Sequence, residues 1–124
     1  MIRIDASGGK PIYEQIIDNI KEDVLKGYLK EGDAIPSVRK LALSLSITPG
    51  TVAKAYQELE RQKIIVTIRG KGTFISSKPQ GKVDEDKMNT VREILKAQVI
   101  AMKFMDLSRE DVMEIVRELY DSLE

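Results

Sequence analysis

The sequence of 124 residues is long enough for one compact domain, or for a small domain with a helical extension. It contains no Cys and no His, which excludes disulfides and thiolate sites and removes the commonest general base and metal ligand. The absence of any run of about 18 apolar residues excludes a membrane span, and the N-terminus has no secretory leader. We therefore expect a cytoplasmic protein that carries neither a metal nor a cofactor. We do not expect an enzyme, although the carboxylates and lysines leave catalysis open at this point.

The net charge is zero, but the charges are unevenly distributed along the chain. Residues 1–80 carry 13 Lys and Arg against 9 Asp and Glu, whereas residues 81–124 carry 7 against 11. Within 35–78 the balance is clearly basic, because 8 basic residues stand against only Glu58 and Glu60. A basic middle joined to an acidic tail indicates a polyanionic partner, although a solvated charged face would give the same bias.

The first predicted helix covers residues 11–27. Pro11 suits the first helical turn and Gly27 suits the C-terminal exit. One row of apolar residues follows the helical period: Ile12, Ile16, Ile20 and Val24.

Two shorter helices follow, separated by about three residues. Ser37 can cap the first, at 37–45, and the second begins with Thr48 as a plausible cap and Pro49 in the first helical position. Two short helices at this spacing form a helix-turn-helix candidate. The expected inner face of the second is apolar: Val52, Ala55, Tyr56 and Leu59.

Beyond these helices the pattern changes to that of strands. Apolar segments flank a Gly70-Lys71-Gly72 turn, so that 64–76 predicts a β-hairpin with a basic tip. A polar linker at 76–82 marks a boundary, and two further helices follow, the first over about 84–105. Ser108 and Asp111 resemble a capping box at the start of the second. Each of these two helices carries a stripe of apolar residues that is too wide for the other helix to cover alone, which predicts pairing with a second copy.

A helix, a helix-turn-helix and then a β-hairpin is the order of a winged helix-turn-helix. Arg39 is expected on the outer face of its helix, where it can contact a phosphate or a base edge. The hairpin presents Arg69 and Lys71 to the DNA backbone or the minor groove. The exposed face of the third helix is small and polar, and it fits a major groove about 12 Å wide: Gly50, Thr51, Lys54, Gln57 and Glu58.

Three motifs in this order and spacing resemble the GntR family of bacterial transcription factors. They are I-P-S-V-R-K-L-A (35–42), T-V-A-K-A-Y-Q-E-L-E (51–60) and R-G-K-G-T-F-I (69–75). The resemblance covers about residues 11–76. The short two-helix tail is similar to that of the YtrA-like subfamily, in which the resemblance implies a role in dimerisation.

The resemblance also implies which positions contact DNA. Many family members have Arg or Asn near positions 49 and 50, where this chain has Pro49 and Gly50. Base recognition is therefore expected to shift to Thr51 and Lys54, and Arg39 is left open as a contact to a base or to phosphate alone. The full predicted set is Ser37, Arg39, Thr48, Gly50, Thr51, Lys54, Arg69, Gly70, Lys71, Gly72 and Thr73.

We accordingly predict a mainly α fold with a small β-hairpin: a winged helix-turn-helix DNA-binding domain at 1–77 and a helical dimerisation region at 82–124. The expected partner is double-stranded DNA, bound by a homodimer at a pseudo-palindromic operator, most simply for repression. The sequence does not identify a small-molecule effector. Two alternatives are a winged helix used only for protein–protein contact, and a fragment of a regulator–enzyme fusion. The basic middle counts against the first, and the short tail counts against the second.

Overall fold

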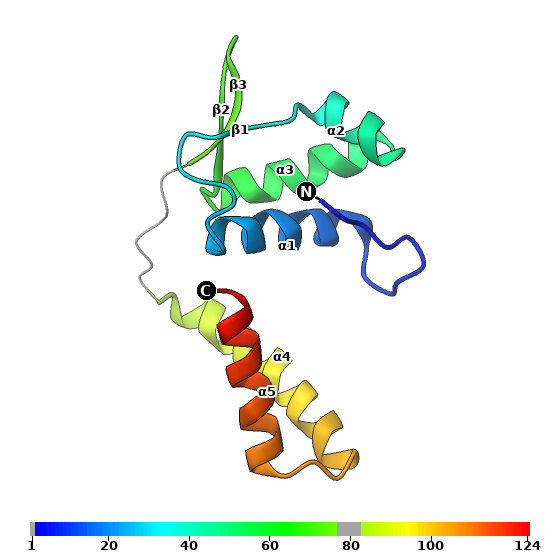
Figure 1. The fold of residues 1–124 in the computed structure, drawn as a ribbon, viewed down its shortest axis with the longest axis vertical. Coiled ribbons are helices and arrows are strands. Elements are labelled where there is room, and N and C mark those ends of the chain that lie inside the picture. Colours follow the sequence, from blue (N-terminus) through cyan, green and yellow to red (C-terminus); the bar gives the residue numbers. More distant parts are fainter. Residues whose placement is uncertain (1, 77–82) are drawn as a thin grey trace. The chain divides into compact units, whose positions relative to one another are not determined.

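The computed structural model describes residues 2–76 and 83–124 (Figure 1). The chain divides into two compact units, residues 1–79 and residues 80–124. The predicted linker, apart from Ser76, lies outside the described residues. We call the first unit the winged unit and the second the tail, and describe each by itself.

Three helices form the main part of the winged unit, as predicted. They are α1 (Ile12–Leu25), α2 (Val38–Leu45) and α3 (Pro49–Arg61), and α3 packs against both α1 and α2. The apolar rows predicted from sequence meet between them, with Ile16, Ile20, Val52 and Leu59 almost completely buried. All four predicted inner-face residues of α3 are buried, which confirms that prediction. In Figure 1, α3 lies between α1 and α2.

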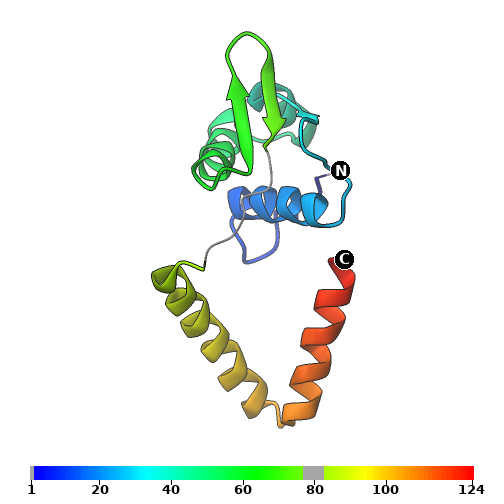
Figure 2. The same cartoon turned by 90° about the vertical axis from the view of Figure 1, so that its left-hand side faces the viewer.

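A three-stranded antiparallel sheet completes this unit. It consists of β1 (Ala34–Ile35), β2 (Ile65–Ile68) and β3 (Gly72–Ile75), in the order β1-β3-β2. The hairpin of β2 and β3 was predicted, but β1 was not, because two residues carry no recognisable period. Buried Ile35, Ile65 and Ile75 bring the sheet into the same core as the helices. Figure 2 shows the hairpin extending beyond the helices as a wing.

The tail consists of α4 (Glu85–Phe104) and α5 (Arg109–Ser122). Ser108 and Asp111 form the predicted capping box, in which each side chain accepts a hydrogen bond from the other residue's backbone N–H. The two helices diverge from the turn between them (Figure 2), and neither contains a buried side chain. Among the described residues, no helix is both long and apolar enough to cross a membrane.

Candidate nucleic-acid interface

The start of α2 presents Ser37 and Arg39 at the surface. The Ser37 side chain accepts a hydrogen bond from the Lys40 N–H at 3.1 Å, so Ser37 is the N-cap that the sequence predicted. Arg39 is exposed in the first turn of the helix, and no carboxylate among the described residues pairs with its guanidinium. The cap therefore fixes the backbone that carries Arg39 and leaves the side chain directed to solvent.

A buried tyrosine connects α3 to the segment before this cap. The Tyr56 hydroxyl donates a hydrogen bond to the Pro36 carbonyl at 2.7 Å, and burial raises the pKa of Tyr56 to about 12. Sequence analysis placed Tyr56 on the inner face but did not predict its partner. The available signal was general, because a buried tyrosine hydroxyl usually finds a hydrogen-bond acceptor. Through this bond, α3 supports the position from which α2 and Arg39 begin.

The start of α3 is only partly as predicted. Thr48 occupies the N-cap position, but its side chain caps no backbone N–H and instead lies 2.9 Å from the Thr51 hydroxyl. The expected side-chain cap is therefore absent, because the two threonine hydroxyls bond to each other. Gly50 is exposed, and a Cβ added there would meet nothing within 4 Å among the described residues. No side chain projects from α3 at Gly50, so the backbone or the bases of a nucleic acid can approach this end of the helix closely.

Lys54 lies one turn further along α3 and is exposed. Its ammonium lies 3.9 Å from the centroid of the Tyr13 ring, which belongs to α1. Sequence analysis did not associate these two residues, since nothing in a helical period relates positions 41 residues apart. Lys54 therefore leans from the outer face of α3 toward α1.

The two acidic residues of α3 are engaged by local partners. Glu58 accepts hydrogen bonds from Arg61 at 2.9 and 2.5 Å and from Gln62 at 2.9 Å, and these bonds lower its pKa to about 2. Glu60 accepts a hydrogen bond from the Thr67 hydroxyl of β2 at 2.5 Å. Both carboxylates are thereby directed to neighbours in the winged unit, which lessens their repulsion of an approaching polyanion.

The wing turn differs by one residue from the prediction. It consists of Arg69, Gly70 and Lys71, closed by a hydrogen bond from the Lys71 N–H to the Ile68 carbonyl at 2.9 Å, whereas Gly72 already belongs to β3. Gly70 has a φ of 78° and Gly72 a φ of 127°, so a side chain at either position would strain the backbone. Arg69 and Lys71 are exposed at the tip of the hairpin.

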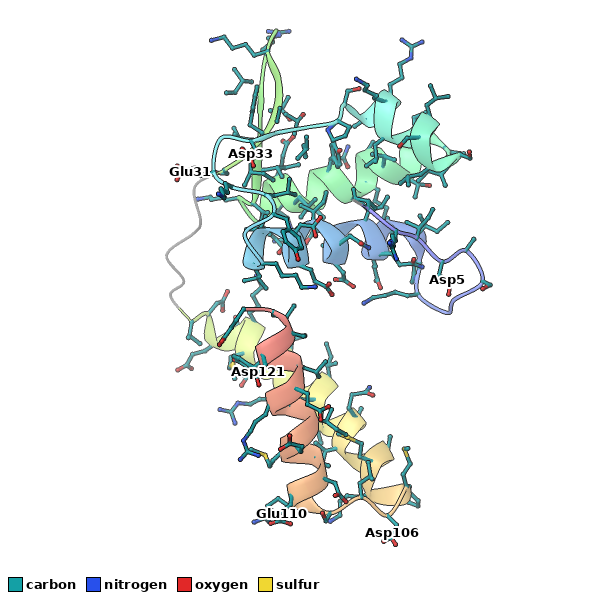
Figure 3. The ribbon with its side chains drawn as sticks, in the orientation of Figure 1. Asp5, Glu31, Asp33, Asp106, Glu110 and Asp121 are labelled. Carbon is teal, nitrogen blue, oxygen red and sulfur yellow. The ribbon has the colours of Figure 1, made fainter. Side chains whose placement is uncertain are left out.

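Thr73 is the predicted wing residue that does not lie at the tip. It is half-buried, pairs with Thr67 across the hairpin, and its hydroxyl lies 3.4 Å from that of Thr67. Glu31 and Asp33 lie at the base of the hairpin rather than beside the tip (Figure 3). The cations of the turn therefore have no acidic neighbour at the end of the wing within the described residues.

Comparisons with known proteins relate this unit to DNA-binding regulators. A model of bacterial regulatory proteins of the gntR family matches residues 12–75. The HTH-type transcriptional repressor YtrA of Bacillus subtilis (strain 168) is 45% identical over 119 residues, which are 96% of this chain and 92% of that protein.

Two solved structures are similar over nearly the whole chain. A transcriptional antiterminator from Listeria monocytogenes EGD-e has a TM-score of 0.89 and 38% identity, covering 100% of this chain and 93% of that chain. YtrA from Sulfolobus acidocaldarius, a GntR-family transcription factor, has a TM-score of 0.59 and 32% identity, covering 97% of both chains. The similarity thus includes the tail as well as the winged unit.

Proposed function

The chain belongs to the GntR family of bacterial regulatory proteins, and on this premise we propose that it represses transcription as a homodimer bound to a pseudo-palindromic operator. As a member of this family it is a DNA-binding transcriptional regulator. Repression is supported by the name of the Bacillus subtilis relative, a transcriptional repressor. The place of action is then the cytoplasm, where bacterial DNA lies.

One observation carries the proposed DNA contacts. The winged unit exposes cations on α2 and at the wing turn, while both carboxylates of α3 are held by Arg61 and Thr67. In this proposal Arg39, Lys54, Arg69 and Lys71 supply the positive charge. The remaining contacts come from small and polar residues at the helix starts and the wing: Ser37, Thr48, Gly50, Thr51, Gly70, Gly72 and Thr73.

The proposed dimer rests on the apolar surface of the tail. Leu95 is 52% exposed, Leu119 58% and Phe104 90% in the single chain. A hollow of about 390 Å³ near the turn is lined by apolar Val99, Leu107 and Met113 among others. A second copy would cover these side chains, and a two-fold symmetric pair is the commonest way in which identical chains do so. Such a pair would supply two winged units for the two halves of one operator.

Selection of bound duplexes from a random pool, using the full-length chain, tests the proposal. We expect an enriched sequence with two related half-sites. Log affinity for this duplex should fall with log salt concentration by about 0.9 for each phosphate neutralised. No enrichment, or an affinity independent of salt, would contradict DNA binding and favour a winged helix that contacts only proteins.

A further inference from the structure

The contact between Tyr13 and Lys54 lies on one flank of α3, the helix whose outer face is proposed to contact DNA. Tyr13 belongs to α1, and the surface between the two helices is lined by Tyr13, Glu14 and Ile17 from α1. The same surface is lined from α3 by Lys54, Gln57, Glu58 and Arg61. The other flank of α3 faces the wing, where Glu60 is bonded to Thr67 of β2. Lys54 is therefore held on the α1 side of the helix and away from the wing.

No carboxylate within residues 2–76 and 83–124 holds Lys54 in this position. Glu58 lies four residues further along α3, the spacing at which a lysine and a glutamate on a helix normally pair. That carboxylate is already bonded to Arg61 and Gln62, and no ion pair of Lys54 exists among the described residues. The Tyr13 ring is thus the group that orients the Lys54 ammonium, through attraction of a cation to the face of an aromatic ring.

Tyr13 is suited to hold a flexible side chain because its own position is constrained. It is half-buried against the core formed with Ile16 and Ile17, and its hydroxyl donates to Glu14 at 3.3 Å. A lysine side chain has four flexible methylene groups, so an unsupported ammonium occupies many positions. Seated on Tyr13, the same ammonium occupies one region beside α3 before any DNA arrives.

We propose that Tyr13 is a positioning residue for DNA binding, whose ring holds the Lys54 ammonium ready to contact DNA on the α1 side of α3. This inference rests on the proposed DNA-binding function, but the contact itself is a property of the free protein. Cation–ring contacts at exposed sites correspond to about a two- to fivefold change in an equilibrium constant. Losing the ring should weaken operator binding by about this factor for each subunit.

The first experiment measures the contact without DNA. In the full-length chain, the ring current of Tyr13 should shift the Lys54 ε-methylene protons upfield in the NMR spectrum, with Lys54→Arg used to assign the signal. Tyr13→Phe should keep the shift and Tyr13→Leu should abolish it, while Tyr28→Leu, at a tyrosine that is 73% exposed, should leave it unchanged. A Lys54 signal that does not change in Tyr13→Leu would overturn the inference whether or not the protein binds DNA.

The second experiment measures operator affinity in a double-mutant cycle. Tyr13→Leu should weaken binding two- to fivefold per subunit in the wild-type background and have no effect in Lys54→Ala, while Tyr13→Phe should bind like the wild type. An increase in affinity in Tyr13→Leu would show that the ring withholds Lys54 from DNA, and would overturn the proposal. An equal loss in both backgrounds would overturn it too, since Tyr13 would then act independently of Lys54. If the wild type binds no duplex, the function fails while the NMR result still decides the contact.

Discussion

The winged unit and the tail are both largely helical, but they differ in how far their apolar side chains are buried. Every buried hydrophobic residue among the described parts of the chain belongs to the winged unit, where three helices and a sheet enclose them. In the tail, α4 and α5 carry comparable apolar stripes and bury none of them. A stripe becomes a core only if another element covers it. The winged unit contains the elements that cover its own stripes, whereas the tail leaves its stripes exposed in the single chain.

The two units also differ in the sign of their charge. Residues 35–78 have a basic excess, while the tail is acidic, and Asp106, Glu110 and Asp121 lie along its surface in Figure 3. An acidic tail is repelled by the DNA that the winged unit attracts. Our proposal gives DNA binding to one unit and association to the other, and each role can be tested separately.

Removal of the tail should have the largest effect on operator binding. A chain ending at residue 77 keeps the complete core of the winged unit, so we expect it to fold and to be monomeric. Two linked half-site contacts become one, which should weaken operator affinity by about 100- to 10,000-fold. Analytical ultracentrifugation and binding to the selected operator measure both effects. A truncated chain that remains a tight dimer would show that the tail is not the association surface.

Alanine substitution of one leucine in each unit should separate a core from an interface. Leu59 is fully buried in the winged unit, so Leu59→Ala should lower the free energy of unfolding by about 2–5 kcal/mol at any protein concentration. Leu119 is 58% exposed in the single chain. The effect of Leu119→Ala should therefore appear as weaker dimerisation, with a melting temperature that depends on concentration. Equal, concentration-independent losses would remove the distinction between the units.

The features predictable from sequence were those that follow a local rule. The helices were predicted because their apolar residues recur at the helical period, and the caps at Ser37 and Ser108 because a short polar side chain there bonds a nearby N–H. The hairpin was predicted from two apolar segments that flank a turn containing glycines. Each of these signals lies within a few residues of the structure that it determines.

The features that sequence analysis missed depend on contacts between distant segments. Strand β1 exists because Ala34 and Ile35 pair with β3, and two residues contain no pattern of their own. The bond from Tyr56 to Pro36 and the contact of Lys54 with Tyr13 join residues that only the packing of α3 brings together. Thr48 was predicted as a cap. A threonine hydroxyl can bond either to a backbone N–H or to a neighbouring hydroxyl, and here its partner is the Thr51 hydroxyl.

Within the winged unit, Arg39 should contribute more to binding than any single wing cation. Its planar guanidinium can donate two parallel hydrogen bonds to a guanine or a phosphate. If Arg39 contacts a base, Arg39→Ala should cost about 1–3 kcal/mol and relax the preference at one operator position. Binding to a panel of single-base operator variants measures both. A uniform loss across the panel would make Arg39 a phosphate contact, with base recognition left to Thr51 and Lys54.

Lys71 should contribute less, and without sequence preference. It is a flexible charge in the turn next to Gly70, so it is suited to general attraction by the backbone or the minor groove. Lys71→Ala should weaken all operator variants nearly equally and lower the salt slope by about one per subunit. The same panel at several salt concentrations provides the measurement. A loss confined to one operator position would show instead that the wing recognises a base.

The smallest predicted effect concerns acid stability of the winged unit. Glu58 has a pKa of about 2 in the folded chain, lowered by its bonds to Arg61 and Gln62, against an ordinary value of 4.5. As the pH falls below 4.5, Glu58 becomes protonated in the unfolded chain before it does so in the folded chain. The contribution of Glu58 to the free energy of unfolding is therefore lost between about pH 4.5 and 2. The wild type should therefore have a higher melting temperature than Glu58→Gln at pH 6, and the two melting temperatures should converge toward pH 3. Because the bonds lie within one unit, the difference should not depend on protein concentration, and a concentration-dependent difference would place Glu58 at an interface between chains.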